Sequence, residues 1–230
     1  MLATLTDSLA QFLESLGADW VLWLLIGLLA ISIVVMIERG IYFARHRVDV
    51  NVLSKQLIGA AREGGQQKAR EQLQGVGGMT GGVLNAALDA WDDGVESMEE
   101  VVQAAIGRER TLYDRWLAIL GTLGNSAPFI GLFGTVIGIL TAFAALGSGL
   151  EGAELKGQVM SKIGEALVAT AVGLGVAIPS VVAFNFYKNR IRVMSAETEA
   201  VARLLLAHLK SRPRTEHEPH AKPRVVQGGH

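Results

Sequence analysis

The sequence contains no cysteine, and this absence excludes several classes of structure and activity. A chain without thiols has no disulfide framework, no thiolate metal site and no cysteine nucleophile. Its formal net charge is −1 over 230 residues, so bulk charge gives no support to nucleic-acid binding. Phosphate-binding glycine loops, HExxH motifs and Ser/His/Asp arrangements are also missing. We therefore expect neither an enzyme nor a chain with a bound cofactor or metal.

Three long stretches have few or no charged residues, and each of these stretches predicts a membrane-spanning helix. Half of the residues are apolar, with a mean hydropathy of +0.34. A helix needs about 20 mostly apolar residues to cross roughly 30 Å of hydrocarbon. Residues 20–37 and 117–146 carry no charge, and residues 163–187 carry only Glu165. The prediction is an all-α polytopic membrane protein with three transmembrane helices.

Basic residues are absent from residues 1–18, and their distribution predicts the topology. Of the 21 Lys and Arg residues, ten lie between Arg39 and Arg115 and nine lie from Lys188 onward. Because basic segments stay in the cytoplasm, we predict that the N-terminus lies outside and the C-terminus lies in the cytoplasm. A cleaved signal peptide is the alternative for the first apolar stretch. Such a peptide begins with basic residues, which this chain lacks there.

These patterns divide the chain into eight predicted segments. They are an outer interfacial amphipathic helix (1–18), a first span (19–38), a cytoplasmic helical loop (39–115), a second span (116–146), a short periplasmic connection (147–161), a third span (162–187), a cytoplasmic helix (188–210) and a disordered tail (211–230). For the first segment, a helix packed on its own protein is an equal alternative. The tail contains His217 and His220, which we interpret as solvated residues and not as metal ligands.

Helical periodicity continues from both inner spans into the cytoplasmic segments. Apolar residues recur from Val95 to Trp116, and no breaker separates them from the second span. A similar stripe follows the third span, from Tyr187 to Leu205. We expect two long helices that cross the interface and form a helical stalk. Amphipathic helices on the bilayer surface are the alternative.

Glu165 is the only acidic residue within the three apolar stretches, and a charged side chain there is costly. Insertion scales put the cost at about 2.5–3.5 kcal/mol at the centre of the membrane. Thr170 lies five residues deeper, and Thr135 lies near the middle of the second span. Because these spans are antiparallel, the two threonines can lie at similar depth and line a polar path. Further lining candidates are Asn125, Thr122 and Thr141.

Each of these polar residues also has a structural interpretation. A threonine in a membrane helix usually bonds to the carbonyl of its own preceding turn. Glu165 lies three residues from Lys162, and its carboxylate could reach the outer headgroups. From the residues alone, both interpretations stay open.

Small residues and prolines indicate how the inner spans pack. Gly134 and Gly138 form a GxxxG pair, and Gly173 lies in a similar small-residue row with Ala169. Such rows let helix backbones approach closely. The prolines Pro128 and Pro179 each remove one backbone hydrogen bond, which allows a kink or a carbonyl that faces water.

Two runs in these spans resemble a known family. Residues 127–136 read APFIGLFGTV, and residues 164–174 read GEALVATAVGL. Both closely resemble the core of the MotA/TolQ/ExbB proton channel family, in the right order and spacing. The sequences resemble each other closely over residues 117–190, whereas elsewhere only the arrangement of spans and segments is similar. Three spans with an outer N-terminus are similar to the ExbB/TolQ branch, because MotA has four spans.

The resemblance implies an assembly and a mechanism. Family members form a ring, typically a homopentamer, around a dimer of a single-span ExbD/TolR-type partner whose membrane Asp takes up and releases protons. Matching positions make Glu165 the acid of the third span and make Thr135 and Thr170 pore-lining residues. The implied function is a proton-driven motor of the bacterial inner membrane that acts on an envelope system. TonB-dependent transport is the first candidate, with a TonB/TolA-like energy transducer as a further partner. A hypothesis that goes with this function is that the apolar face of the second and third spans, with its small residues, gives the partner a low-friction track.

Other functions stay open at this point. Tol-Pal envelope maintenance or a gliding-motility stator would use the same core, and sodium is not excluded as the coupling ion. A passive membrane scaffold is the rival of another class. In a scaffold, replacing Glu165 by Gln would leave function intact, whereas replacing the packing glycines by larger residues would impair it.

Overall fold

The computed structural model describes residues 19–46, 48–146 and 152–211, and all regular secondary structure in these residues is helical. The elements are α2 (Asp19–Arg45), α3 (Val50–Gln72), α4 (Gly78–Asp89), the short 3-10 helix η1 (Trp91–Asp93), α5 (Val95–Asp114), α6 (Leu117–Leu146) and α7 (Gly152–Lys210). The helix predicted for 1–18 and the tail from residue 212 lie outside the described residues.

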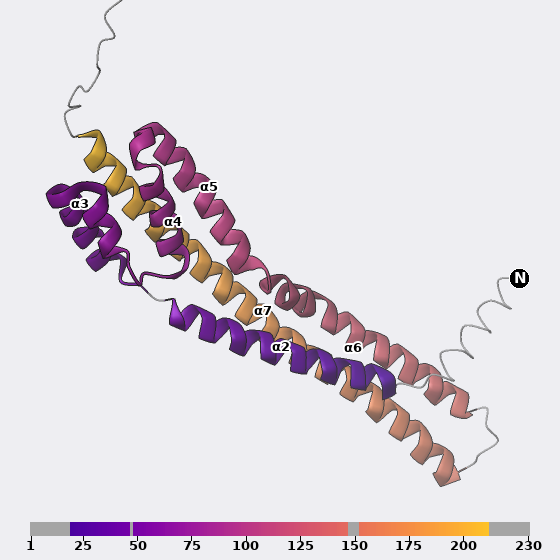
Figure 1. Cartoon of the computed structure of the whole chain (residues 1–230). Helices are drawn as coiled ribbons and strands as arrows, with labels where there is room; N and C mark the ends of the chain where they lie inside the picture. The colour runs from indigo at the N-terminus through magenta and orange to yellow at the C-terminus, as the bar shows by residue number, and fades with distance from the viewer. Residues whose placement is uncertain (1–18, 47, 147–151, 212–230) are drawn as a thin grey trace, which may run out of the picture.

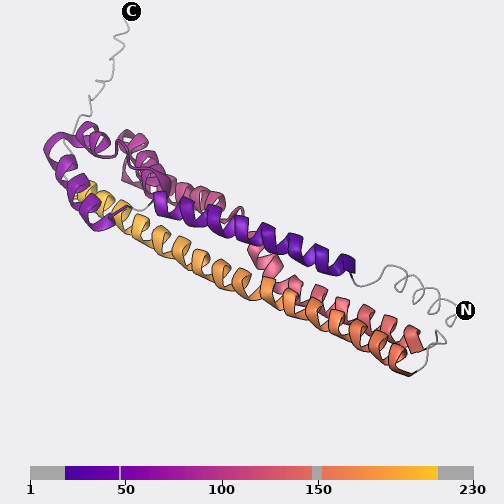
Figure 2. The same cartoon turned by 90° about the horizontal axis from the view of Figure 1, so that it is seen from below.

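Three helices are long and apolar enough to cross a membrane, as the sequence predicts. By length and composition, the candidate spans lie in α2, α6 and α7. Helices α6 and α7 run antiparallel along each other, and α2 packs beside both of them (Figure 1). Figure 2, seen from below, shows the same elongated bundle.

Large apolar side chains cover the outside of these three helices. Trp23 on α2, Phe129 on α6 and Leu167 on α7 are 72%, 71% and 64% exposed. Helices that are apolar on all sides belong in a membrane or in the core of a large protein. Lipid or further protein must therefore cover this surface.

The other helices form a subdomain at one end of the bundle. Helices α3, α4 and α5 pack against the C-terminal half of α7 (Figure 1). Its core is apolar and fully buried, with Leu57, Leu84, Met98 and Leu205 among its members. One buried polar pair lies inside it, between the hydroxyls of Thr80 and Thr198 at 2.9 Å. Each hydroxyl satisfies the other, so the pair can stay buried.

The predicted continuous helix from Val95 through the second span is wrong, because α5 ends at Asp114 and α6 begins at Leu117. At the junction the chain makes a tighter turn, in which the amide of Ile119 donates to the carbonyl oxygen of Trp116. The side chains of Asp114 and Arg39 hold this junction. Lys188 of α7 forms an ion pair with Asp114 at 2.9 Å, and Arg39 of α2 donates to the carbonyl oxygen of Tyr113.

Helix α7 is continuous over 59 residues, from one end of the molecule to the other. It passes through Pro179 without a break, and it begins at Gly152, so part of the predicted periplasmic connection is helical. Of the two helices expected to cross the interface unbroken, only α7 does so. It therefore connects the membrane-spanning half directly with the subdomain.

Candidate channel site in α6 and α7

Glu165 lies on α7 near the end of the spans that is far from the subdomain. Its carboxylate forms an ion pair with Lys162 at 2.9 Å, one turn away on the same helix, and the Ser161 hydroxyl lies 3.4 Å from its other oxygen. Both partners of the ion pair are 40% exposed. The carboxylate is therefore neither buried among apolar groups nor free in solvent, and it has a cation within reach.

A shallow hollow between α2 and α7 brings a second acid to Glu165. The residues around it are Asp19, Leu22, Glu165, Val168 and Ala169. Asp19 is the first residue of α2, where an acidic side chain also complements the positive end of the helix dipole. Sequence reasoning missed Asp19, because it precedes the first apolar stretch by one residue. Its position in the sequence could have identified it, because Asp19 lies at the outer end of the first span, at the membrane depth predicted for Glu165.

The contacts between α6 and α7 place Thr135 and Thr170 at the same depth. A Cβ added at Gly134 would lie 2.8 Å from the Cβ of Ala169, so these two residues face each other. Thr135 follows Gly134 in the chain, and Thr170 follows Ala169. At 1.5 Å per residue, Thr170 lies about 7.5 Å along α7 from Glu165. The structure thus aligns the acid and the two threonines along one pair of helices.

The two threonines differ in their hydrogen bonds. The Thr135 hydroxyl donates to the carbonyl oxygen of Leu132 at 2.6 Å, in the preceding turn of α6. The Thr170 hydroxyl is buried and has no hydrogen-bond partner within the described part of the chain. A buried hydroxyl without a partner is costly. Within the described residues, the Thr170 hydroxyl therefore lacks the hydrogen bond that Thr135 makes to its own helix.

The further lining candidates are spread along α6. Thr122 and Thr141 donate to carbonyl oxygens of their own preceding turns, those of Ala118 and Gly138. Asn125 is exposed on the surface of the bundle. Thr141 lies toward the same end as Glu165, because Gly138 packs on Ala166. Thr122 and Asn125 lie toward the subdomain, away from the acid.

The small residues lie inside the α6–α7 contact, where the backbones nearly touch. Added Cβ atoms at Gly138 and Gly173 would lie 2.5 Å from the Cβ of Ala166 and 2.8 Å from the carbonyl oxygen of Ala127. Gly134, Gly138 and Gly173 are all buried. The hypothesis that these glycines form a track for a moving partner is therefore wrong, since α6 and α7 already cover them. They set the distance between the two helices.

Both membrane prolines lie within unbroken helices. Pro128 is inside α6 and Pro179 is inside α7. Next to Pro179, the buried hydroxyl of Ser180 pairs with that of Ser32 on α2 at 2.7 Å and also lies 2.7 Å from the carbonyl oxygen of Val176. This pair fixes α2 to α7 in the middle of the spans. No group of His, Asp and Glu residues suited to a metal ion occurs among the described residues.

Comparison with known proteins identifies the family. Residues 78–200, more than half of the chain, match the model of the MotA/TolQ/ExbB proton channel family. The chain belongs to this family. The matched segment contains α6, the membrane-spanning part of α7 and the predicted polar residues from Thr122 to Thr170, whereas Asp19 and Ser32 on α2 lie outside it. The family is one of membrane channels, which agrees with the three apolar helices.

Relatives from two branches of the family resemble the chain. It is 42% identical over 94 residues to the biopolymer transport protein ExbB of Xanthomonas campestris pv. campestris (strain B100), covering 41% of this chain and 36% of the relative. It is 44% identical over 90 residues to ExbB of Neisseria gonorrhoeae, covering 39% and 40%. It is 39% identical over 100 residues to the Tol-Pal system protein TolQ of Pseudomonas aeruginosa, covering 44% and 42%. The alignments thus span about two fifths of the relatives' length.

Proposed function

We propose that this chain is the ring-forming channel subunit of a proton-driven motor in the bacterial inner membrane, working with a dimer of a single-span ExbD/TolR-type partner. The observation that carries the proposal is the alignment of Glu165, Thr170 and Thr135 along two antiparallel helices that glycines hold in close contact. This alignment lies in the segment that matches a proton channel family. A ring, typically a homopentamer, would also cover the apolar side chains that a single copy exposes.

The basic residues support the proposed topology. The subdomain end of the bundle carries most of the Lys and Arg residues, so it faces the cytoplasm and the Glu165 end faces the periplasm. Protons then enter near Glu165 and Asp19, move past the level of the two threonines and leave on the cytoplasmic side. The electrical potential alone supplies about 2.3 kcal/mol per charge per 100 mV. Sodium is the alternative coupling ion.

In this mechanism the residues of the chain have distinct roles. Glu165, paired with Lys162, holds negative charge at the proton entrance. Thr135 and Thr170 provide polar groups at the level where a partner's carboxylate would change its protonation state. Protonation removes the cost of exposing that carboxylate to apolar walls, and this biases the movement of the partner against the ring.

We favour TonB-dependent transport as the process that the motor drives. The relatives named ExbB share 42% and 44% identity with the chain, and the relative named TolQ shares 39%. Because these values are close, Tol-Pal envelope maintenance is the second candidate. A gliding-motility stator is the third. The energy transducer would be a TonB-like or TolA-like protein in the first two cases.

A passive membrane scaffold is the rival from another class, and co-purification separates the two. The tagged chain is extracted from its native membranes in mild detergent, and the intact complex is weighed by native mass spectrometry. We expect a ring of several copies with a short single-span protein that has a membrane Asp. A chain that elutes without any such partner would favour the scaffold. The identity of the envelope protein that accompanies the complex names the process driven.

A further inference from the structure

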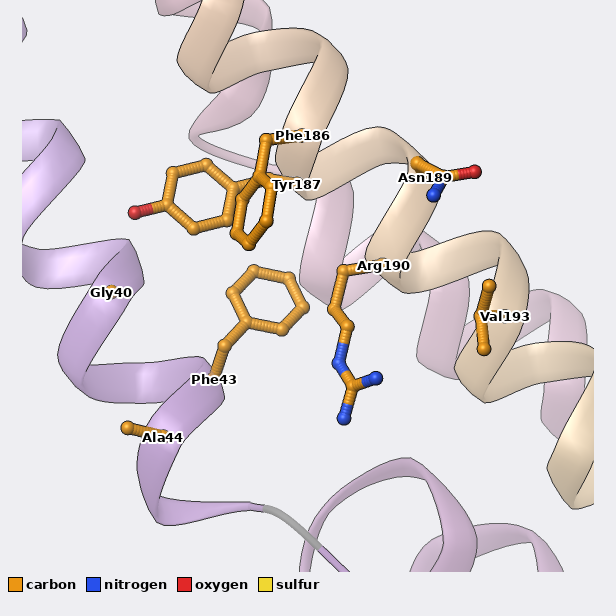
Figure 3. Close-up of a pocket in the computed structure, with 8 residues that line it drawn as sticks. All are labelled: Gly40, Phe43, Ala44, Phe186, Tyr187, Asn189, Arg190 and Val193. Atoms are coloured by element: carbon orange, nitrogen blue, oxygen red, sulfur yellow. The ribbon is translucent and has the colours of Figure 1, made fainter.

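A groove between the end of α2 and the middle of α7 has no role in the proposed channel. Its lining comes from Gly40, Phe43, Ala44, Phe186, Tyr187, Asn189, Arg190 and Val193. Figure 3 shows the side chains of Phe43 and Arg190 pointing into the space between the two helices, whereas Asn189 points away from α2. The groove therefore combines aromatic walls with one cationic group.

The aromatic part of the groove has a rigid floor and an exposed edge. The rings of Phe43 and Tyr187 stack with their centroids 5.2 Å apart, and both side chains are buried. The Tyr187 hydroxyl donates to the carbonyl oxygen of Met36 at 2.8 Å, which fixes its ring. Phe186, beside this floor, is 63% exposed. An apolar ligand can thus lie on Phe186 without disturbing the packed pair.

Arg190 has no hydrogen-bond or ion-pair partner among the described residues. Two acids whose partners lie close to groove residues in the chain are already paired, Glu38 with Arg39 and Asp114 with Lys188. A guanidinium at the edge of an apolar groove favours an acceptor with two oxygens, such as a phosphate group. The positive charge of the groove is therefore available to an anion.

The groove lies at the boundary between hydrocarbon and headgroups. Tyr187 is the last residue of the third apolar stretch, and Arg190 lies three residues, or about 4.5 Å, further along α7. A headgroup layer adds about 5–7 Å on each side of the hydrocarbon. This places the guanidinium in the headgroup layer of the leaflet at the subdomain end. Phe186 lies at the edge of the hydrocarbon.

From these observations we propose that the groove binds an anionic phospholipid, with its phosphate on Arg190 and an acyl chain on Phe186. The phosphodiester supplies the acceptor that Arg190 lacks, and the acyl chain covers the exposed ring. Free phosphate would pair with Arg190 but would leave the ring of Phe186 exposed. Basic pockets between transmembrane helices on the cytoplasmic side bind anionic headgroups in this way. Arg45, next in the chain to the groove residue Ala44, adds positive charge, which favours phosphatidylglycerol over a zwitterionic lipid.

Native mass spectrometry from nanodiscs tests this site on the full-length chain. The discs contain phosphatidylglycerol and phosphatidylethanolamine in equal amounts, and the measurement counts the lipids that each released complex retains. Arg190→Gln removes the proposed phosphate contact. The matched control is Arg192→Gln, because Arg192 is an exposed arginine on the same helix that does not line the groove. Phe186→Ala tests the acyl-chain contact.

We expect Arg190→Gln to lower the retained phosphatidylglycerol about fivefold and Arg192→Gln to leave it unchanged, a difference typical of one arginine at an anionic surface. Phe186→Ala lowers it as well, and millimolar inorganic phosphate does not displace the lipid from the wild type. Displacement by phosphate would make this a free-anion site and overturn the proposal. Equal retention in both arginine variants would also overturn it. If Arg190→Gln instead reduced the number of chains in the released complex and left the number of lipids per chain unchanged, the groove would be a contact with a second copy of the chain, and the lipid proposal would be overturned.

Discussion

Gly134→Ala is the substitution whose effect the structure determines most directly. The new methyl carbon would lie 2.8 Å from the Cβ of Ala169 and 3.2 Å from Cγ1 of Val21. Carbon atoms in contact prefer about 3.5–4.0 Å, so α6 has to move away from α7 and α2. Overpacking of this kind costs about 1–3 kcal/mol. Alanine regains roughly 1 kcal/mol of helix propensity over glycine, which leaves a net loss of about 0–2 kcal/mol.

Gly175→Ala is the matched control on α7. Nothing lies within 4 Å of a Cβ at this position, so only the propensity gain of about 1 kcal/mol remains. The two variants should therefore differ by the overpacking cost of about 1–3 kcal/mol. The assay is the free energy of unfolding of the detergent-solubilised chain, from an SDS titration in mixed micelles followed by tryptophan fluorescence.

A reciprocal exchange sharpens this test. Combining Gly134→Ala with Ala169→Gly removes the methyl carbon that the new side chain meets, and leaves the looser contact with Val21. The double variant should be more stable than the sum of the two single changes predicts. Equal stability of Gly134→Ala and Gly175→Ala, or strict additivity in the double variant, would refute the packing between α6 and α7 described above.

Two further predictions concern groups outside this contact. Burial raises the pKa of Tyr113 to about 12, from an ordinary value near 10, although the Met79 amide that donates to its hydroxyl lowers it. Because the folded chain holds this proton at pH values where the unfolded chain has lost it, stability should fall from pH 10 to about 12, by up to about 1.4 kcal/mol per pH unit. Tyr113→Phe should reduce this slope in the unfolding titration, and the remainder comes in part from the other buried tyrosine, Tyr187. An identical slope would contradict the burial of the Tyr113 hydroxyl. Ser180→Ala breaks the hydroxyl pair with Ser32 and should cost only about 0.6 kcal/mol, the average for such bonds in membranes. A loss of several kcal/mol would assign this pair a larger role.

The sequence predicts the membrane-spanning part well because the membrane imposes strong constraints on it. A helix in lipid must be long, apolar and free of charge, and α2, α6 and α7 meet these conditions visibly. The spacing of Gly134 and Gly138 likewise indicated close helix packing. Spacing does not say which surface the glycines face. Their burial against α7, and not against a moving partner, needed the register of the two helices.

The break between α5 and α6 could not be predicted, because no local signal encodes it. The residues from Tyr113 to Leu117 include no proline or glycine, and each is compatible with a helix. The junction depends on contacts from distant parts of the chain, Lys188 on Asp114 and Arg39 on the Tyr113 carbonyl. The hollow shared by Asp19 and Glu165 depends in the same way on how α2 packs against α7.

Proton flux tests the central claim most directly. The purified complex, with its single-span partner, is reconstituted in liposomes that contain a pH-sensitive dye, and a potential is applied across the membrane. Glu165→Gln keeps the size of the side chain and removes its charge, whereas Lys162→Gln removes only the ion-pair partner. We predict that Glu165→Gln lowers the flux at least tenfold and that Lys162→Gln retains most of it. Equal flux through the wild type and Glu165→Gln would contradict a role of this carboxylate in proton conduction.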